Sequence, residues 1–300
     1  MLMTGNIFIL MTCLQHSSPD PGRLTALEEA LRRAIEGQAT VYGIVYQRLD
    51  HPEQVTINAE DLMHAASTMK VPVMLRLFEM VEQGKLSLDQ PIPVKNRFKS
   101  ILDGSEYLID VDSDQELYGH VGQSLPLHHL IELMIVRSSN LATNILVELA
   151  DAPSIMDLMN RLGADPIKVL RGVQDLKAYE AGLSNRCSAQ AMATVMAATG
   201  DSPLFSGKSR ERMLAILRRQ QFTEMIPAGL PPEAGARVAN KTGSISSVQH
   251  DAAYITLPGG VRYVLVVFAR DFSGEEGREE VNQTAARLSR LVYQHISGQN

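Results

Sequence analysis

The sequence lacks the residues that mark several large classes of protein. Only two of its 300 residues are cysteines, Cys13 and Cys187, which excludes a disulfide-stapled scaffold and a cysteine-rich zinc module. Lysine and arginine number 28 against 34 aspartates and glutamates and form no basic block, so we expect no nucleic-acid partner. No repeat or low-complexity tract occurs, which excludes a solenoid.

The apolar run near the N-terminus, Asn6–Leu14, is short. A membrane span needs roughly 18 apolar residues, so we expect no stable span. The run is long enough for the core of a secretory signal, but no lysine or arginine precedes Arg23 and no small-x-small cleavage site is present. We interpret residues 1–21 as either a degenerate export signal or an extension outside the fold.

The remaining composition is that of a folded protein. Apolar residues make up 45% and charged residues 21% of the chain, close to the average for globular proteins. A chain of this length buries about three quarters of the surface that it exposes when unfolded. It therefore holds a core without disulfides, as one large domain or two intimate lobes.

Hydrophobic periodicity predicts strands and helices at both ends of the chain and helices between them. At the two ends we expect helices at Leu24–Ile35 and Glu279–Ile296, and strands at Thr40–Tyr46, Gln54–Asn58, Arg237–Ile245, Ala252–Leu257 and Val261–Arg270. In the middle we expect helices at Val71–Gln83, Leu127–Val136, Leu141–Ala150, Ala189–Ala198 and Arg210–Arg219. The Pro258–Gly260 segment predicts a tight turn between the last two strands.

This order favours an α+β fold of two lobes. Residues 22–62 and 228–300 form an α/β lobe, in which strands from both ends build one antiparallel sheet under the terminal helices. Residues 63–227 form an inserted all-helical lobe, and the two lobes make one functional domain. A cleft between lobes is a common place for a ligand site.

Several catalytic and ligand motifs are absent. The sequence contains no G-x-S-x-G, H-E-x-x-H, C-x-x-C or G-x-G-x-x-G. Gly207–Ser209 lacks the earlier glycine and the preceding strand of a phosphate-binding loop. His128 and His129 are adjacent, so on a helix they point about 100° apart and cannot share one metal. We expect neither a metal nor a cofactor.

Three short strings carry the chemistry: Ser67–Lys70, Ser138–Asn140 and Lys241–Gly243. The first opens a helix after a strand, the second separates two helices, and the third lies in a strand. Each string is weak by itself, but this order and these contexts together indicate a serine nucleophile.

Ser67 needs a base before its hydroxyl attacks, and Lys70 lies one helical turn away, on the same face. Burial and the nearby Lys241 would both lower the pKa of the Lys70 amine. The backbone N–H groups of Ser67 and Ser244 could form an oxyanion hole.

The other residues of the three strings suit substrate binding and proton transfer. Ser138 can pass a proton to a leaving nitrogen, and Asn140 can orient Lys70 and bond a substrate amide. A substrate carboxylate suits the strand residues Lys241, Thr242, Gly243 and Ser244.

These strings resemble the penicillin-recognising serine hydrolases, most closely the class A β-lactamases. The resemblance runs from about Leu24 to the end of the chain, and Asn144 matches a family asparagine one turn after Ser-x-Asn. It implies a β-lactam, an acyl-D-amino acid or an ester as substrate. It also favours a periplasmic or secreted location.

Two departures from the family pattern concern the site. Ser139 stands at the centre of the second string, where class A enzymes have an aspartate. The family's omega loop starts at Arg171 and carries its deacylating glutamate two residues later, where this chain has Val173. Asn185 replaces the aspartate that closes the loop.

The glutamate's absence leaves two nearby carboxylates, Asp175 and Glu180, as possible deacylation bases, or as loop-bracing or solvated groups. Three functions therefore remain open: a β-lactamase, a D-Ala-D-Ala peptidase or esterase, and a β-lactam binder that acylates without turnover.

Overall fold

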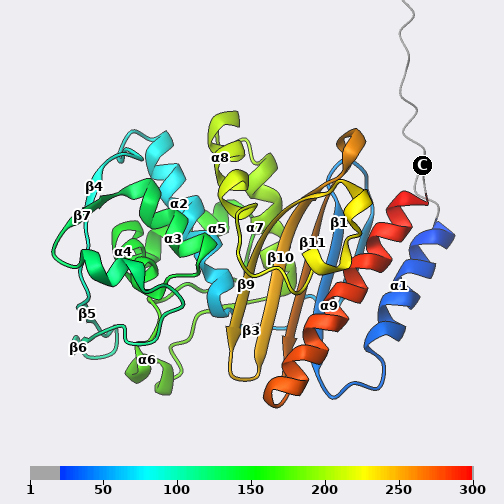
Figure 1. Cartoon of the computed structure of the whole chain (residues 1–300), viewed down its shortest axis with the longest axis horizontal. Helices are drawn as coiled ribbons and strands as arrows, with labels where there is room; N and C mark the ends of the chain where they lie inside the picture. Colours follow the sequence, from blue (N-terminus) through cyan, green and yellow to red (C-terminus); the bar gives the residue numbers. More distant parts are fainter. Residues whose placement is uncertain (1–20, 299–300) are drawn as a thin grey trace, which may run out of the picture.

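A computed structural model describes residues 21–298, and its centre is a five-stranded sheet (Figure 1). The strands are β1 (Val41–Arg48), β2 (Gln54–Ile57), β9 (Arg237–Ile245), β10 (Val248–Thr256) and β11 (Arg262–Arg270). Their order is β2-β1-β11-β10-β9, and every neighbouring pair is antiparallel. The prediction of one antiparallel sheet from both ends of the chain is confirmed.

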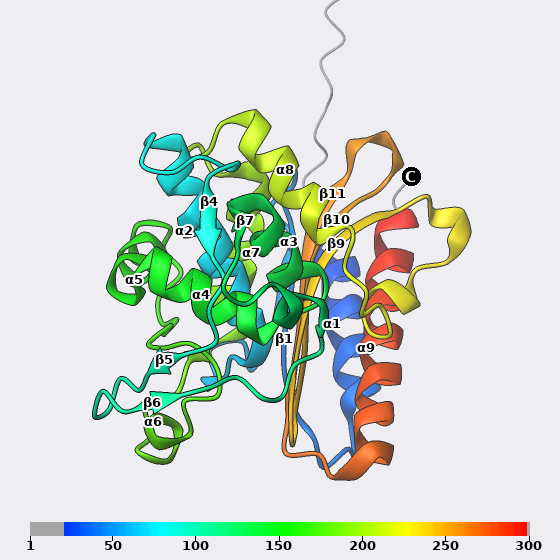
Figure 2. The same cartoon turned by 60° about the vertical axis from the view of Figure 1, so that its left-hand side comes forward.

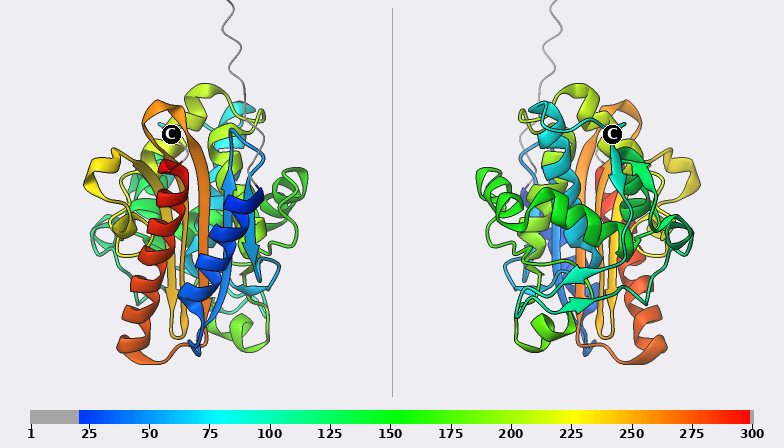
Figure 3. Two further views of the ribbon diagram at one scale, coloured as in Figure 1. Left: turned by 90° about the vertical axis from the view of Figure 1, so that its right-hand side faces the viewer. Right: turned by 90° about the vertical axis from the view of Figure 1, so that its left-hand side faces the viewer.

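The two faces of the sheet bury different sets of side chains. Along β11, Tyr263, Leu265 and Val267 pack in a core with α1 (Pro21–Ile35) and α9 (Gly274–Ser297). Val264, Val266 and Phe268 alternate with them and pack on the helical side. This period of two follows from the pleat of a strand. Figure 3 shows α1 and α9 side by side on the first face.

The second face of the sheet is covered by the middle of the chain (Figure 2). Its helices are α2 (Lys70–Glu82), α3 (Leu127–Val136), α4 (Asn140–Ala150), α5 (Ala152–Arg161), α6 (Leu176–Glu180), α7 (Ala189–Asp201) and α8 (Gly207–Leu217). Helix α7 lies against β1, β10 and β11. The sheet and the helices thus share one core, and the proposed lobe boundaries stay a prediction.

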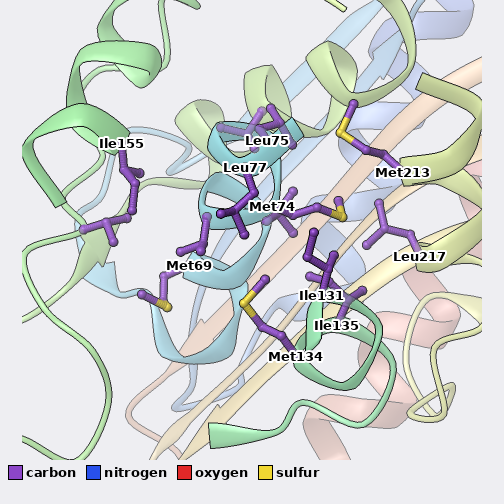
Figure 4. Close-up of a cluster of buried hydrophobic side chains, with 14 of the residues drawn as sticks. Met69, Met74, Leu75, Leu77, Ile131, Met134, Ile135, Ile155, Met213 and Leu217 are labelled. Carbon is purple, nitrogen blue, oxygen red and sulfur yellow. The ribbon is translucent and has the colours of Figure 1, made fainter. Parts of the chain in front are cut away.

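Helix α2 is the centre of this core. Its side chains from Val71 to Phe78 are buried, apart from Arg76, so a helix that is apolar on nearly every side lies inside the protein. Figure 4 shows Met74 and Leu77 of α2 among side chains of α3 and α8, including Ile131 and Met213. The residues at the start of α2 are therefore held rigidly.

Short elements connect these parts. Small strands are β3 (Met63–His64), β4 (Pro91–Pro93), β5 (Phe98–Lys99), β6 (Glu106–Tyr107), β7 (Ser124–Pro126) and β8 (Arg186–Cys187). The 3₁₀ helices are η1 (Ala66–Met69), η2 (Glu116–His120), η3 (Pro227–Gly229), η4 (Pro232–Ala234) and η5 (Pro258–Gly260). The predicted turn at Pro258–Gly260 is η5, between β10 and β11.

Two helices were not predicted, α5 and α6. Both start at an aspartate N-cap: Asp151 accepts from the Ser154 N–H, and Asp175 accepts from the Ala178 N–H. Of residues 1–21, interpreted above as a leader or an extension, residues 1–20 lie outside the described residues, and Pro21 is the first residue of α1. Within residues 21–298 no helix is both long and apolar enough to cross a membrane.

Gly229 packs η3 directly against α9, which generates a test of this packing. A Cβ at Gly229 would lie 2.0 Å from the Ala286 carbonyl oxygen and 2.7 Å from the Ser289 Cβ. We expect Gly229→Ala to lower the free energy of unfolding by about 1–3 kcal/mol, since α9 must move, as measured by urea denaturation.

Gly119→Ala is the matched control. A Cβ at Gly119 would meet no heavy atom within 4 Å in the described structure, so this variant should keep the wild-type stability. Equal stability of the two variants would contradict close packing of η3 on α9.

Candidate active site

The first and third strings meet where β9 packs against the start of α2. Ser67 lies in η1, one turn before α2, and is half-buried. A Cβ at Gly243 would lie 2.9 Å from the Ser67 backbone nitrogen. Only glycine lets strand β9 approach the serine this closely, which explains the third residue of Lys241–Gly243.

The second string closes the site from the helical side. Ser138 connects α3 to α4 in a left-handed conformation with φ of 57°. The Lys70 Nζ donates to the Ser138 carbonyl oxygen at 2.7 Å, to the Ser138 Oγ at 3.1 Å and to the Asn140 Oδ1 at 3.0 Å. All three strings are thus brought together.

Ser138 also contacts the second lysine. The Lys241 Nζ donates to the Ser138 Oγ at 3.1 Å and to the Thr242 carbonyl oxygen at 2.8 Å. One hydroxyl oxygen therefore lies between the amines of Lys70 and Lys241. Both lysines are fully buried.

The hydrogen-bond partners of the Lys70 amine differ from the one expected, which was the Ser67 hydroxyl. Among the described residues, the Lys70 amine bonds Ser138 and Asn140, and no hydrogen bond joins it to the Ser67 hydroxyl. The acceptors across the cleft hold the amine on their side. Catalytic hydrogen bonds often shorten only when a substrate is bound.

Burial perturbs both amines, and the charge of Lys241 adds to the shift of Lys70. Burial, and then the charge of Lys241, lower the pKa of Lys70 well below its usual range, against the opposing charge of Asp112. Burial lowers the pKa of Lys241 to about 7, and the Asp251 carboxylate opposes this shift. An amine that has lost its proton at neutral pH can act as a base.

A cavity of about 750 Å³ lies beside Ser67. Asn140 and Ser244 line it together with Val173 and Leu108. It is therefore bounded by α4, the end of β9, the segment after β6 and the loop before α6. Thr242 and Gly243 are buried in β9 behind Ser244.

The loop that starts at Arg171 is held through its backbone. The Asn144 Oδ1 accepts from the Val173 N–H at 2.7 Å, and its Nδ2 donates to the Val173 carbonyl at 3.0 Å. Asn185 bonds both the N–H and the carbonyl of Arg171. Its amide contacts the main chain of the arginine, and the guanidinium bonds the Leu183 and Gly172 carbonyls instead.

The two carboxylates near this loop differ in surroundings. Asp175 is buried and accepts from the Ser100 Oγ at 2.8 Å, the Ile101 N–H at 2.9 Å and the Ala178 N–H at 3.1 Å. Glu180 is exposed at the end of α6. These contacts favour the bracing role for Asp175 and the solvated role for Glu180.

One charged residue of the site was missed in the sequence. Arg278 of α9 donates to the Ser244 Oγ and, at 2.9 Å, to the Gln249 Oε1. It adds a cation beside the predicted carboxylate-binding strand. Its position in a charged helix gave no signal, because only the packing of α9 on the sheet brings it there.

The family model described as the β-lactamase enzyme family matches residues 26–296. The chain belongs to the β-lactamase enzyme family. It is a serine hydrolase of the β-lactamase type, as its three strings predicted.

Two curated relatives of this β-lactamase family member are each 24% identical to it. The extended-spectrum β-lactamase PER-1 of Pseudomonas aeruginosa aligns over 89% of this chain and 86% of its own length. A β-lactamase of Phocaeicola vulgatus aligns over 96% and 91%. Among solved structures, PBP-A is 27% identical with a TM-score of 0.78, over 92% of this chain and 97% of its own. A variant of PBP-A was solved as an acyl-enzyme complex with penicillin G.

The lowered pKa of Lys241 predicts how activity changes with pH. Its amine is charged below about pH 7 and neutral above it. We expect the ratio of kcat/KM for benzylpenicillin to kcat/KM for p-nitrophenyl acetate to fall as pH rises, by about tenfold at one to two pH units above that pKa. Only the penicillin has a carboxylate for Lys241 to bind, and the ratio cancels the titration of Lys70.

Lys241→Arg provides the control, since a guanidinium stays charged across this range. Its ratio should not depend on pH. A pH-independent ratio in the wild-type enzyme would exclude Lys241 as the titrating cation.

Proposed function

We propose that this protein is acylated on Ser67 by β-lactams and hydrolyses the acyl-enzyme slowly. The observation that carries the proposal is the Ser138 Oγ, 3.1 Å from each of the Lys70 and Lys241 amines. Ser67, three residues before Lys70, lines the cavity together with Asn140 and Ser244. This arrangement supplies a nucleophile, a base and a proton carrier.

We expect acylation to use these groups in turn, with the Lys70 amine moving from its contacts with Ser138 and Asn140 towards Ser67. Neutral Lys70 takes the proton of Ser67, and the Ser67 oxygen attacks the lactam carbonyl. The backbone N–H groups of Ser67 and Ser244 stabilise the negative oxygen. As the C–N bond breaks, Ser138 gives its proton to the nitrogen and regains one from the Lys70 ammonium.

The surroundings of the cavity suit both parts of a penicillin. Arg278, which donates to the hydroxyl of Ser244, and Lys241, buried in the same strand as Ser244, supply positive charge for the carboxylate. Exposed apolar side chains of Leu108, Val111 and Leu176 also line the cavity. We expect an apolar acyl group to bind there.

Deacylation lacks an obvious base. Val173 occupies the family's glutamate position, the Asp175 oxygens accept three hydrogen bonds, and Glu180 does not line the cavity. A long-lived acyl-enzyme is also the behaviour of a penicillin-binding D-Ala-D-Ala peptidase, and the likeness to PBP-A favours that second candidate. Such a peptide presents the same carboxylate to Lys241.

Intact-mass measurement over time after mixing with benzylpenicillin tests the proposal. We expect the wild-type protein to gain the mass of the intact penicillin quickly and to lose it slowly. Ser67→Ala should gain no mass, because the variant has no hydroxyl to acylate.

The thermal midpoint of Ser67→Ala serves as its folding control, since the side chain is small and half-buried. Rapid clearance in the wild type indicates an efficient β-lactamase, and persistence indicates the peptidase or a binder that acylates without turnover. An adduct on Ser67→Ala would remove Ser67 from the mechanism.

Restoring a carboxylate in the loop should shorten the lifetime of the acyl-enzyme. Val173 lines the cavity and its backbone is held by Asn144, so a glutamate there is presented towards the ester. We expect Val173→Glu to raise the deacylation rate by about 10²-fold, within the range of general-base catalysis, as measured by loss of the adduct.

Val173→Gln has the same size without a basic oxygen and should clear the adduct at the wild-type rate. Equal rates for the Glu and Gln variants would show that residue 173 does not reach the deacylating water.

A further inference from the structure

The loop between β6 and η2 contributes a carboxylate to the start of α4. The Asp112 Oδ1 accepts from the Asn140 N–H at 2.8 Å, and its Oδ2 accepts from the Leu141 N–H at 2.8 Å. The Oδ2 also accepts from the hydroxyls of Tyr118 at 3.2 Å and Ser139 at 3.3 Å. Asp112 is not part of the second string, but it thus holds Ser139 and Asn140 of that string in place.

The same loop fixes the side chain of Asn140. The Asn140 Nδ2 donates to the Val111 carbonyl at 2.9 Å, and its Oδ1 accepts from the Lys70 Nζ at 3.0 Å. Because the carbonyl of Val111 accepts only from the NH₂ end of the amide, the oxygen must face Lys70. Residues 111 and 112 therefore hold both the backbone and the amide of Asn140.

Ser139 occupies the position at which the family resemblance places an aspartate. Its side chain is fully buried, caps the Ala142 N–H and donates to Asp112. The carboxylate missing from position 139 thus has a substitute 27 residues earlier in the chain. Because Asp112 contacts Ser139 directly, the Asp112 carboxylate lies close to the position of the family's aspartate.

We propose that Asp112 is a positioning residue, which replaces the family's central Ser-x-Asn carboxylate and holds Ser138 and Asn140 against Lys70. This inference rests on the proposed acylation of Ser67. It adds a residue that the three strings do not contain.

If Asp112 only joined the loop to α4, its replacement would change the stability of the protein and leave the acylation rate unchanged. Asp112 also acts on Lys70 through its charge, since it raises the pKa of that amine while burial and Lys241 lower it. The other charged groups on this segment are Asp110 and Asp114, and Arg137 after α3 pairs with Asp114 at 3.1 Å. Tyr118 faces Asp112 from η2.

The test compares Asp112→Asn with the wild type. We expect the acylation rate constant with benzylpenicillin to fall by about 10- to 100-fold, because a displaced catalytic group loses its alignment. Removing the anion also lowers the pKa of Lys70, so the acid limb of the acylation–pH profile should move to lower pH.

The swap Asp112→Ser with Ser139→Asp supplies the rescue. It returns a carboxylate to the family position, and we expect it to recover most of the rate that Asp112→Ser loses. Glu116→Gln is the matched control, because Glu116 is an exposed carboxylate of η2 that pairs with Arg137 and does not line the cavity. It removes a neighbouring charge without touching α4, and it should acylate at the wild-type rate.

Two results would overturn the proposal. One is an Asp112→Asn protein with lowered thermal stability but an unchanged rate and acid limb. The other is a swap variant whose acylation rate constant is no higher than that of Asp112→Ser. This second comparison remains valid even if Asp112→Asn does not fold.

A separate readout distinguishes this inference from the proposed function. The ¹⁵Nζ shift of Lys70 in lysine-labelled protein, assigned with Lys70→Arg, reports its titration without any substrate. A wild-type protein that no acyl donor modifies would refute the proposed function. An unchanged Lys70 titration in Asp112→Asn would refute the role of Asp112.

Discussion

Two buried amines that share one half-buried hydroxyl are the interaction on which the site depends. Lys70 and Lys241 are both fully buried, and each donates to the Ser138 Oγ. Charged amines are costly to bury next to each other, so the free energy falls when one gives up its proton. Lys70 can therefore act as the base for Ser67 because two like charges are confined together, and the rest of the fold has to keep the two amines close.

The surrounding structure resists their separation. Lys70 begins a helix that is buried on nearly all sides, and Lys241 lies in a strand that packs on η1 through Gly243. On the third side, Asn144 and Asp112 bind α4 to the omega loop and to the loop before η2. The lysines are thus fixed by a helix, a strand and a turn from three distant parts of the chain, and loosening any one of them would let water reach the charges.

The sequence predicted the frame of this protein better than its loops. The bounds of α3 and β9 match the predicted ranges, because long periodic segments report which face is buried. The three strings were found because each lies within or next to such a segment. Although Asn140 was predicted to orient Lys70, the bond of the Lys70 amine to Ser138 in place of Ser67, the contacts of Asp112 and the approach of Arg278 were not predictable. They depend on how loops and α9 pack across the sheet, and spacing along the chain carries no information about that.

The pairing of β1 with β11 also affects how the chain is made. Val41 of β1 lies opposite Arg270 of β11, so β1 cannot pair with its neighbour until the later strand β11 has been synthesised. Until ribosomes have finished β10 and β11, α7 has no completed sheet to cover, and its apolar surface is open to solvent and to other nascent chains. Closing so long a loop is slow. We therefore expect this protein to depend on protection from aggregation during synthesis, and a premature stop codon before β11 to leave no independently stable fragment.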